Sequence, residues 1–176
     1  MNPKILITND DGISSSGINA LSLAMSEIAD VTIVAPFTEQ SARSHALTLE
    51  SAITLESIYL KNGFKGWAVN GTPVDCVKIA LNSILDDVPD LIISGINHGA
   101  NVGSNLIYSG TVASAYEGAI LGIPSIAISL ASYKIRNFDC SKVVARHIVE
   151  YVLENKPPRG SMLNVNVPNL DIKSLK

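Results

Sequence analysis

The chain has 176 residues, of which 47% are hydrophobic and 16% charged, so it predicts one folded domain with a sizeable core and excludes a disordered chain. A formal net charge of −3 and the lack of any Lys/Arg run argue against a nucleic-acid partner. No apolar stretch is long enough for a membrane helix, and the first residues show no signal-peptide pattern. We therefore expect a cytoplasmic protein without a membrane partner.

Strand-like and helix-like segments alternate along the chain. Runs of β-branched and apolar residues predict strands, and apolar residues at helical spacing predict helices. The predicted strands are 4–8, 30–36, 48–59, 66–70, 91–94, 125–130 and 162–167, and the predicted helices are 16–28, 72–85, 112–121 and 139–155. The order predicts an α/β fold, in which a mainly parallel sheet has helices on both faces and 48–59 pairs with 66–70 in a small β-hairpin.

Two adjacent carboxylates, Asp10 and Asp11, follow the first predicted strand and precede Gly12. Ligands of open α/β sheets bind at the carboxyl ends of the strands. Neighbouring carboxylates repel each other, and a hard divalent cation offsets that repulsion. The same residues also suit a polar turn in which one Asp caps a helix. This motif alone leaves both interpretations open.

Other strand ends add oxygen donors. Ser41 follows the strand at 30–36, and Asn97 follows the strand at 91–94. Carboxylate, hydroxyl and amide oxygens suit Mg²⁺, Mn²⁺ or Ca²⁺ better than Zn²⁺, which favours Cys and His. Cys76 and Cys140 fit no metal or redox spacing and are expected to be reduced and buried.

A cluster of hydroxyl groups, Ser109-Gly110-Thr111, directly precedes a predicted helix. Hydroxyls and free N–H groups at a helix N-terminus favour phosphate, although Ser or Thr can also act there as a simple cap. The chain contains neither a phosphate-binding P-loop motif nor a dinucleotide-binding glycine motif, and it has no Gly-x-Ser-x-Gly elbow. These absences argue against a P-loop NTPase, a dinucleotide dehydrogenase and a serine hydrolase.

Five motifs together resemble the survival protein SurE family of metal-dependent nucleotidases. They are residues 8–13 (TNDDGI), 34–36 with 40–41 (VAP, QS), 71–77 (GTPVDCV), 94–103 (SGINHGANVG) and 108–112 (YSGTV). The resemblance implies a Rossmann-like fold and hydrolysis of nucleoside 5′- and 3′-monophosphates, with short polyphosphate as a further substrate. It also implies one divalent ion, Mg²⁺ or Mn²⁺, in each subunit.

The family's functional residues map onto positions of this sequence. The resemblance implies metal ligation by Asp10, Asp11, Ser41 and Asn97, with Asp10 and Asp11 also catalytic. It implies phosphate contacts from Ser109, Gly110 and Thr111, and places Asn9 and Asn101 on the same pocket. One aspartate would act as a base for water, or Asp10 would form an aspartyl-phosphate; the sequence leaves both routes open.

Family members usually continue for several dozen residues beyond the strand that ends near Pro168. We expect a single domain over residues 1–176 without that extension, and a dimer or tetramer where the extension is present. The alternative to an enzyme is a regulatory module that binds metal and nucleotide without turnover.

Overall fold

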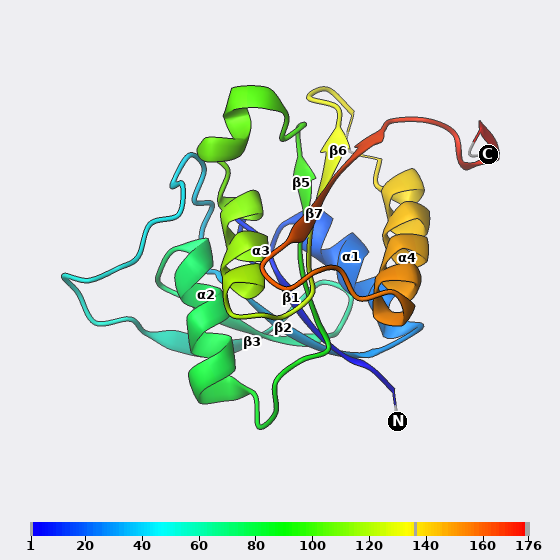
Figure 1. Cartoon of the computed structure of the whole chain (residues 1–176). Coiled ribbons are helices and arrows are strands. Elements are labelled where there is room, and N and C mark those ends of the chain that lie inside the picture. The colour runs from blue at the N-terminus through cyan, green and yellow to red at the C-terminus, as the bar shows by residue number, and fades with distance from the viewer. Residues whose placement is uncertain (1, 136, 175–176) are drawn as a thin grey trace.

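The computed structural model describes residues 2–135 and 137–174 and forms one α/β layer structure (Figure 1). The strands are β1 (Lys4–Thr8), β2 (Asp30–Pro36), β3 (Leu55–Tyr59), β4 (Lys65–Val69), β5 (Leu91–His98), β6 (Ser125–Ala131) and β7 (Met162–Pro168). The helices are α1 (Ser16–Ser26), α2 (Pro73–Ile79), α3 (Gly110–Ile120) and α4 (Asp139–Glu154), with short helical turns at Ala80–Ile84, Gly103–Ile107 and Ile172–Ser174.

The seven strands form one sheet in the order β3-β4-β2-β1-β5-β6-β7. Every neighbouring pair is parallel except β3 and β4, which form the predicted antiparallel hairpin. Helices α1 and α4 cover one face, and α2 and α3 cover the other (Figure 1). The predicted mainly parallel sheet with helices on both faces is confirmed.

Side-chain alternation in β1 explains why both faces of the sheet are covered. Ile5 and Ile7 point into the core under α1 and α4, whereas Leu6 points into the core under α2. All three are fully buried. A strand buried on both faces reads as a continuous apolar run, which is the pattern that predicted it.

Several boundaries differ from the sequence prediction. β5 continues to His98 because its pairing with β6 resumes, after an irregularity, at Asn97 and His98. The predicted strand at 48–59 is shorter and begins at Leu55. The helix predicted to reach residue 85 ends as an α-helix at Ile79 and finishes in a π-helical turn. The parallel strands still end at one edge of the sheet, where their loops gather.

Within the described residues, no helix combines the length and the apolar character needed to cross a bilayer. Cys76 and Cys140 are both buried free thiols, as expected.

Candidate active site

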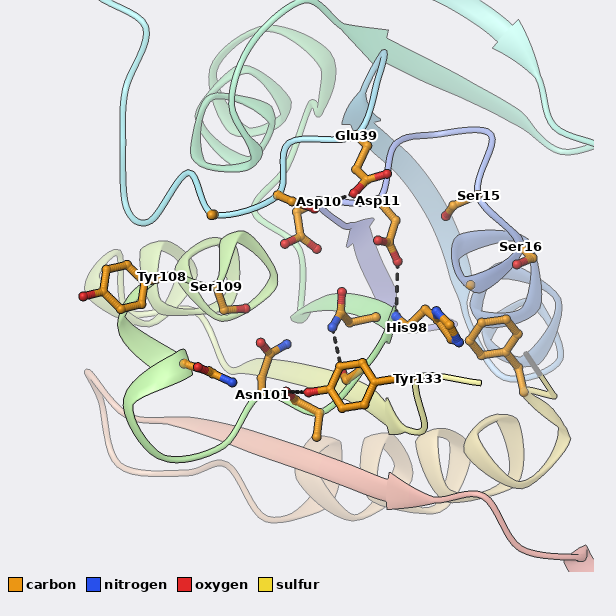
Figure 2. Close-up of a pocket in the computed structure, with 18 of the residues that line it drawn as sticks. Asp10, Asp11, Ser15, Ser16, Glu39, His98, Asn101, Tyr108, Ser109 and Tyr133 are labelled. Atoms are coloured by element: carbon orange, nitrogen blue, oxygen red, sulfur yellow. Dashed lines mark hydrogen bonds between the residues drawn. The ribbon is translucent and has the colours of Figure 1, made fainter. Parts of the chain in front are cut away.

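A pocket of about 590 Å³ opens at the carboxyl edge of the sheet (Figure 2). Its volume lies in the range of small-molecule sites. The loops after β1, β2, β5 and β6 supply its wall, together with the N-terminus of α1. Among the lining residues are Asp10, Asp11, Glu39, Ser41, Asn97, His98, Asn101, Tyr108, Ser109 and Tyr133. Segments far apart in the chain therefore meet at the position that the strand order predicts.

The turn after β1 is held in shape by its own polar groups. The side-chain amide of Asn9 donates to the Gly12 carbonyl (2.9 Å) and to the Ser15 hydroxyl (2.8 Å). Gly12 has φ +91°, a conformation that disfavours any residue with a Cβ atom. Asn9 is completely buried and lies behind the pocket wall. The Asn9 side chain therefore stabilises the turn that carries Asp10 and Asp11.

Asp10 is a buried carboxylate, only 7% exposed. The hydroxyl of Thr111, at the start of α3, donates to it, and Gly110 lies against it so closely that a Cβ there would be 2.8 Å from the Asp10 Cβ. Burial raises the pKa of Asp10, hydrogen bonds from the Thr111 hydroxyl and main chain oppose that rise, and Glu39 adds to it. The net pKa is above the usual value, so the surroundings penalise the unneutralised anion.

Three further oxygen donors lie in the same pocket. Asp11 accepts the main-chain N–H of His98 (3.3 Å), and the amide nitrogen of Asn97 donates to the Gly99 carbonyl (2.7 Å). This contact leaves the Asn97 amide oxygen as its donor toward a cation. The Ser41 hydroxyl donates to Glu39 (2.5 Å).

These donors fit a hard divalent cation. Asp10, Asp11, Ser41 and Asn97 all line one pocket, and each offers oxygen, the ligand atom that Mg²⁺ and Mn²⁺ prefer. The part of the chain that the structure describes has no group of three or more His, Cys, Asp or Glu suited to a metal. The candidate site thus draws half of its ligands from an amide and a hydroxyl.

The phosphate motif has two separate roles in the structure. Ser109 lines the pocket and caps α3, accepting the main-chain N–H of Val112 (3.1 Å). Thr111 is fully buried and engages Asp10, so its hydroxyl orients that carboxylate. Gly110 provides the close approach between α3 and Asp10. Asn101 lines the pocket while its amide nitrogen donates to the Ser129 hydroxyl (3.0 Å).

Glu39 and Tyr133 are among the pocket residues that the sequence analysis did not single out. Glu39 follows β2, two residues before Ser41, and Tyr133 follows β6. The signal for both was available, because every loop after a parallel strand in this sheet emerges at the same edge. Tyr133 also lies beyond the last of the recognisable motifs.

A second buried carboxylate, Glu117 on α3, anchors the loop that carries Ser41. Its side chain is 9% exposed and pairs with His45 (2.7 Å) from that loop and with Lys78 (2.9 Å) from α2. Burial raises the pKa of Glu117, but hydrogen bonds from His45 and Lys78 and the charge of both outweigh burial and leave the pKa below its usual value. Glu117 therefore joins three segments on one side of the pocket.

We expect Glu117→Ala to lower the free energy of unfolding by about 2 kcal/mol at pH 7, a discounted figure because the side chains of Lys78 and His45 are partly exposed. The folded-state pKa is depressed, so the stabilisation is present above the unfolded-state pKa and is lost as the pH falls through the folded-state pKa. Urea unfolding at pH 7 and near pH 4 measures this difference. Exposed Glu150→Ala on α4 is the control. An equal penalty from Glu117→Ala at both pH values would contradict the assignment.

The chain is similar to known proteins over most of its length. The family profile described as "Survival protein SurE" matches residues 5–176. A protein of Chlorobium phaeobacteroides named "5'-nucleotidase SurE" is 48% identical over 168 residues, which are 96% of this chain and 65% of the relative. A protein of Chlorobaculum tepidum with the same name is 45% identical over 174 residues, which are 99% of this chain and 66% of the relative.

A solved structure is also similar. The crystal structure of a SurE protein from Aquifex aeolicus superimposes with a TM-score of 0.90 at 42% identity, covering 99% of this chain and 69% of that one. The chain spans slightly less than two thirds of the length of the relatives from Chlorobium phaeobacteroides and Chlorobaculum tepidum.

Proposed function

The chain belongs to the SurE family, and from this premise we propose that it hydrolyses nucleoside 5′- and 3′-monophosphates to nucleoside and phosphate with one divalent ion, Mg²⁺ or Mn²⁺. The observation that carries the proposal is the convergence of Asp10, Asp11, Ser41 and Asn97 in one pocket beside the N-terminus of α3. Short polyphosphate belongs to the same proposal, because its terminal phosphoryl group presents the same oxygens. The names of the relatives support the reaction class.

Asp10, Asp11, Ser41 and Asn97 would hold the cation, which would supply positive charge to the phosphoryl oxygens. The Ser109 hydroxyl lies on the wall of the same pocket and would donate to one of these oxygens. Thr111 holds Asp10 in place by its hydrogen bond, so the carboxylate is oriented before substrate arrives. Because Asp10 is buried, bulk water has little access to its carboxylate.

The reaction exchanges one P–O bond for another. A bond between phosphorus and the oxygen of water forms, and the bond from phosphorus to the nucleoside oxygen breaks. The water proton passes to a base, and the departing nucleoside oxygen takes up a proton. Of the carboxylates that line the pocket, we propose Asp10 and Asp11 for these proton transfers, in addition to their role as ligands.

Phosphate release from a panel of nucleoside monophosphates tests the proposal on the chain as it stands. We expect release with Mg²⁺ or Mn²⁺ and none in excess EDTA, because the two neighbouring carboxylates would otherwise repel the substrate's anion. Restoring the metal should restore the rate.

Metal binding provides an independent test. Calorimetric titration with Mn²⁺ alone should show one site, and the affinity of that site for Mn²⁺ should fall about tenfold or more in Asn97→Ala. Asn82 is exposed in the turn Ala80–Ile84, outside the pocket, and Asn82→Ala serves as the control. This variant should bind Mn²⁺ as the wild type does. Mn²⁺ and nucleotide binding without phosphate release would instead favour a regulatory module, and release that is insensitive to EDTA would overturn the proposal.

A further inference from the structure

Tyr133 is an exposed aromatic residue on the wall of the candidate active site. It follows β6, lines the pocket, and is 69% exposed. Figure 2 shows it across the pocket from Asp10 and Asp11, near His98 and Asn101. An aromatic ring left open to solvent inside a polar pocket has lost little of its stacking surface to the protein. The ring is therefore available to a ligand.

The ring is also held in place. Its hydroxyl donates to the Ala100 carbonyl (3.2 Å), and the ring leans on Gly99, where a Cβ atom would lie 2.6 Å from Tyr133 Cε1. Gly99 has φ +123°, and its N–H donates to the Leu130 carbonyl (3.0 Å). A ring that is already positioned loses little conformational freedom when a ligand stacks on it.

Tyr133 is coupled to the proposed cation site through Gly99. The Gly99 carbonyl accepts the amide N–H of Asn97 (2.7 Å), one of the proposed metal ligands. The pocket wall next to Tyr133 continues with His98 and with Phe138, which is largely buried. The cation end and this aromatic end thus belong to one cavity, in which a phosphate and a ring system attached to it can bind together.

We propose that Tyr133 is the platform on which the nucleobase of the substrate stacks while the phosphate occupies the cation end. This inference rests on the proposed function and goes beyond it by assigning the base a site. Stacking on a tyrosine ring is tolerant of base identity, because every base has a π-face. The site should accept both purines and pyrimidines, with purines gaining more from their larger ring area.

Tyr108 is the other exposed aromatic residue of the pocket, at 58% exposure. It directly precedes the Ser109-Gly110-Thr111 motif, whereas the Tyr133 ring is held by the hydrogen bond of its hydroxyl to Ala100 and by its packing on Gly99. The better positioned ring of Tyr133 is therefore the stronger candidate for the base. Substitution of each tyrosine separates the two.

The test compares a nucleotide with the same phosphoester lacking its base. We expect Tyr133→Ala to raise KM for AMP about tenfold or more, with little change in kcat, and to leave KM for ribose 5-phosphate unchanged. Tyr133→Phe keeps the ring and should stay within about threefold of wild type. Tyr151→Ala, an exposed tyrosine on α4 outside the pocket, is the matched control.

Binding of AMP and of ribose 5-phosphate in the presence of Mn²⁺, measured by calorimetry, tests the inference even if the protein hydrolyses neither compound. Absence of phosphate release from both compounds would count against the nucleotidase, while a selective loss of AMP affinity in Tyr133→Ala would still support the platform. Equal effects on both ligands, no effect on either, or a selective loss in Tyr108→Ala alone would overturn the platform. A defect in Tyr133→Phe as large as that in Tyr133→Ala would assign the effect to the hydroxyl contact instead.

Discussion

Asp10→Asn should abolish most phosphate release while leaving the fold intact. The carboxylate is proposed both as a cation ligand and as a participant in proton transfer, so its loss should lower the rate by about a hundredfold to ten-thousandfold. Asparagine has nearly the same shape and still offers an oxygen to the Thr111 hydroxyl, which now donates to Asp10. Phosphate release from AMP with Mn²⁺, measured beside a circular-dichroism melt, separates activity from folding.

The stability of this variant should move in the opposite direction to its activity. Burial raises the pKa of Asp10 above its unfolded-state value, so the folded state loses stability as the pH rises through the folded-state pKa. Asn never ionises and escapes that penalty. In EDTA at pH 7, we expect a free energy of unfolding equal to or above that of the wild type.

Asp86→Asn is the matched control for Asp10→Asn. Asp86 is exposed in the loop before β5, at the opposite end of the sheet from the pocket, and its loss should change neither activity nor stability. A fully active Asp10→Asn enzyme would remove Asp10 from the proposed machinery. An unfolded variant would show that Asp10 is chiefly structural.

Gly17→Ala should produce the largest loss of stability among conservative substitutions at the site. A Cβ at Gly17 would lie 2.0 Å from the carbonyl oxygen of Ile96, a main-chain atom that cannot rotate away. Alanine normally favours a helix over glycine by about 1 kcal/mol, so helix propensity alone predicts the opposite sign. We expect a net loss of about 3 kcal/mol, which corresponds to roughly 10 °C in the melting temperature.

The same substitution should also disturb the pocket. Ile96 directly precedes Asn97, so relief of the clash displaces a proposed cation ligand. Thermal melts and Mn²⁺ titration measure the two effects. Ser16→Ala, one residue earlier and exposed on the same helix, should leave the melting temperature within a few degrees of wild type. A Gly17→Ala protein as stable as wild type would show that α1 and β5 can separate at little cost.

Local patterns in the sequence were sufficient for most of the fold. The apolar run at Lys4–Thr8 and the β-branched run at Asp30–Pro36 match β1 and β2 to the residue. The rule that parallel strands end at one edge then placed Asp10, Asp11, Ser41 and Asn97 in one region, and the structure brings all four to one pocket. These predictions depend on periodicity and on chain order, both of which are written in the sequence.

Other features depend on which strands are neighbours and how they are aligned. β5 extends to His98 only because β6 continues to pair with it beyond the irregularity after Ser94. The buried contact of Thr111 with Asp10 joins residues 101 positions apart, and the pairing of Glu117 with His45 joins residues 72 apart. Periodicity within a segment carries no information about such contacts.

By itself, the sequence determined the α/β class, most element positions and the oxygen-donor chemistry of the strand ends, because each follows from residue type and local spacing. Only the tertiary structure decided that Asn9 supports the turn from behind, that Thr111 holds Asp10, and that Tyr133 lies open on the pocket wall. Those outcomes depend on side-chain direction and on packing between distant segments, which arise only once the sheet has assembled.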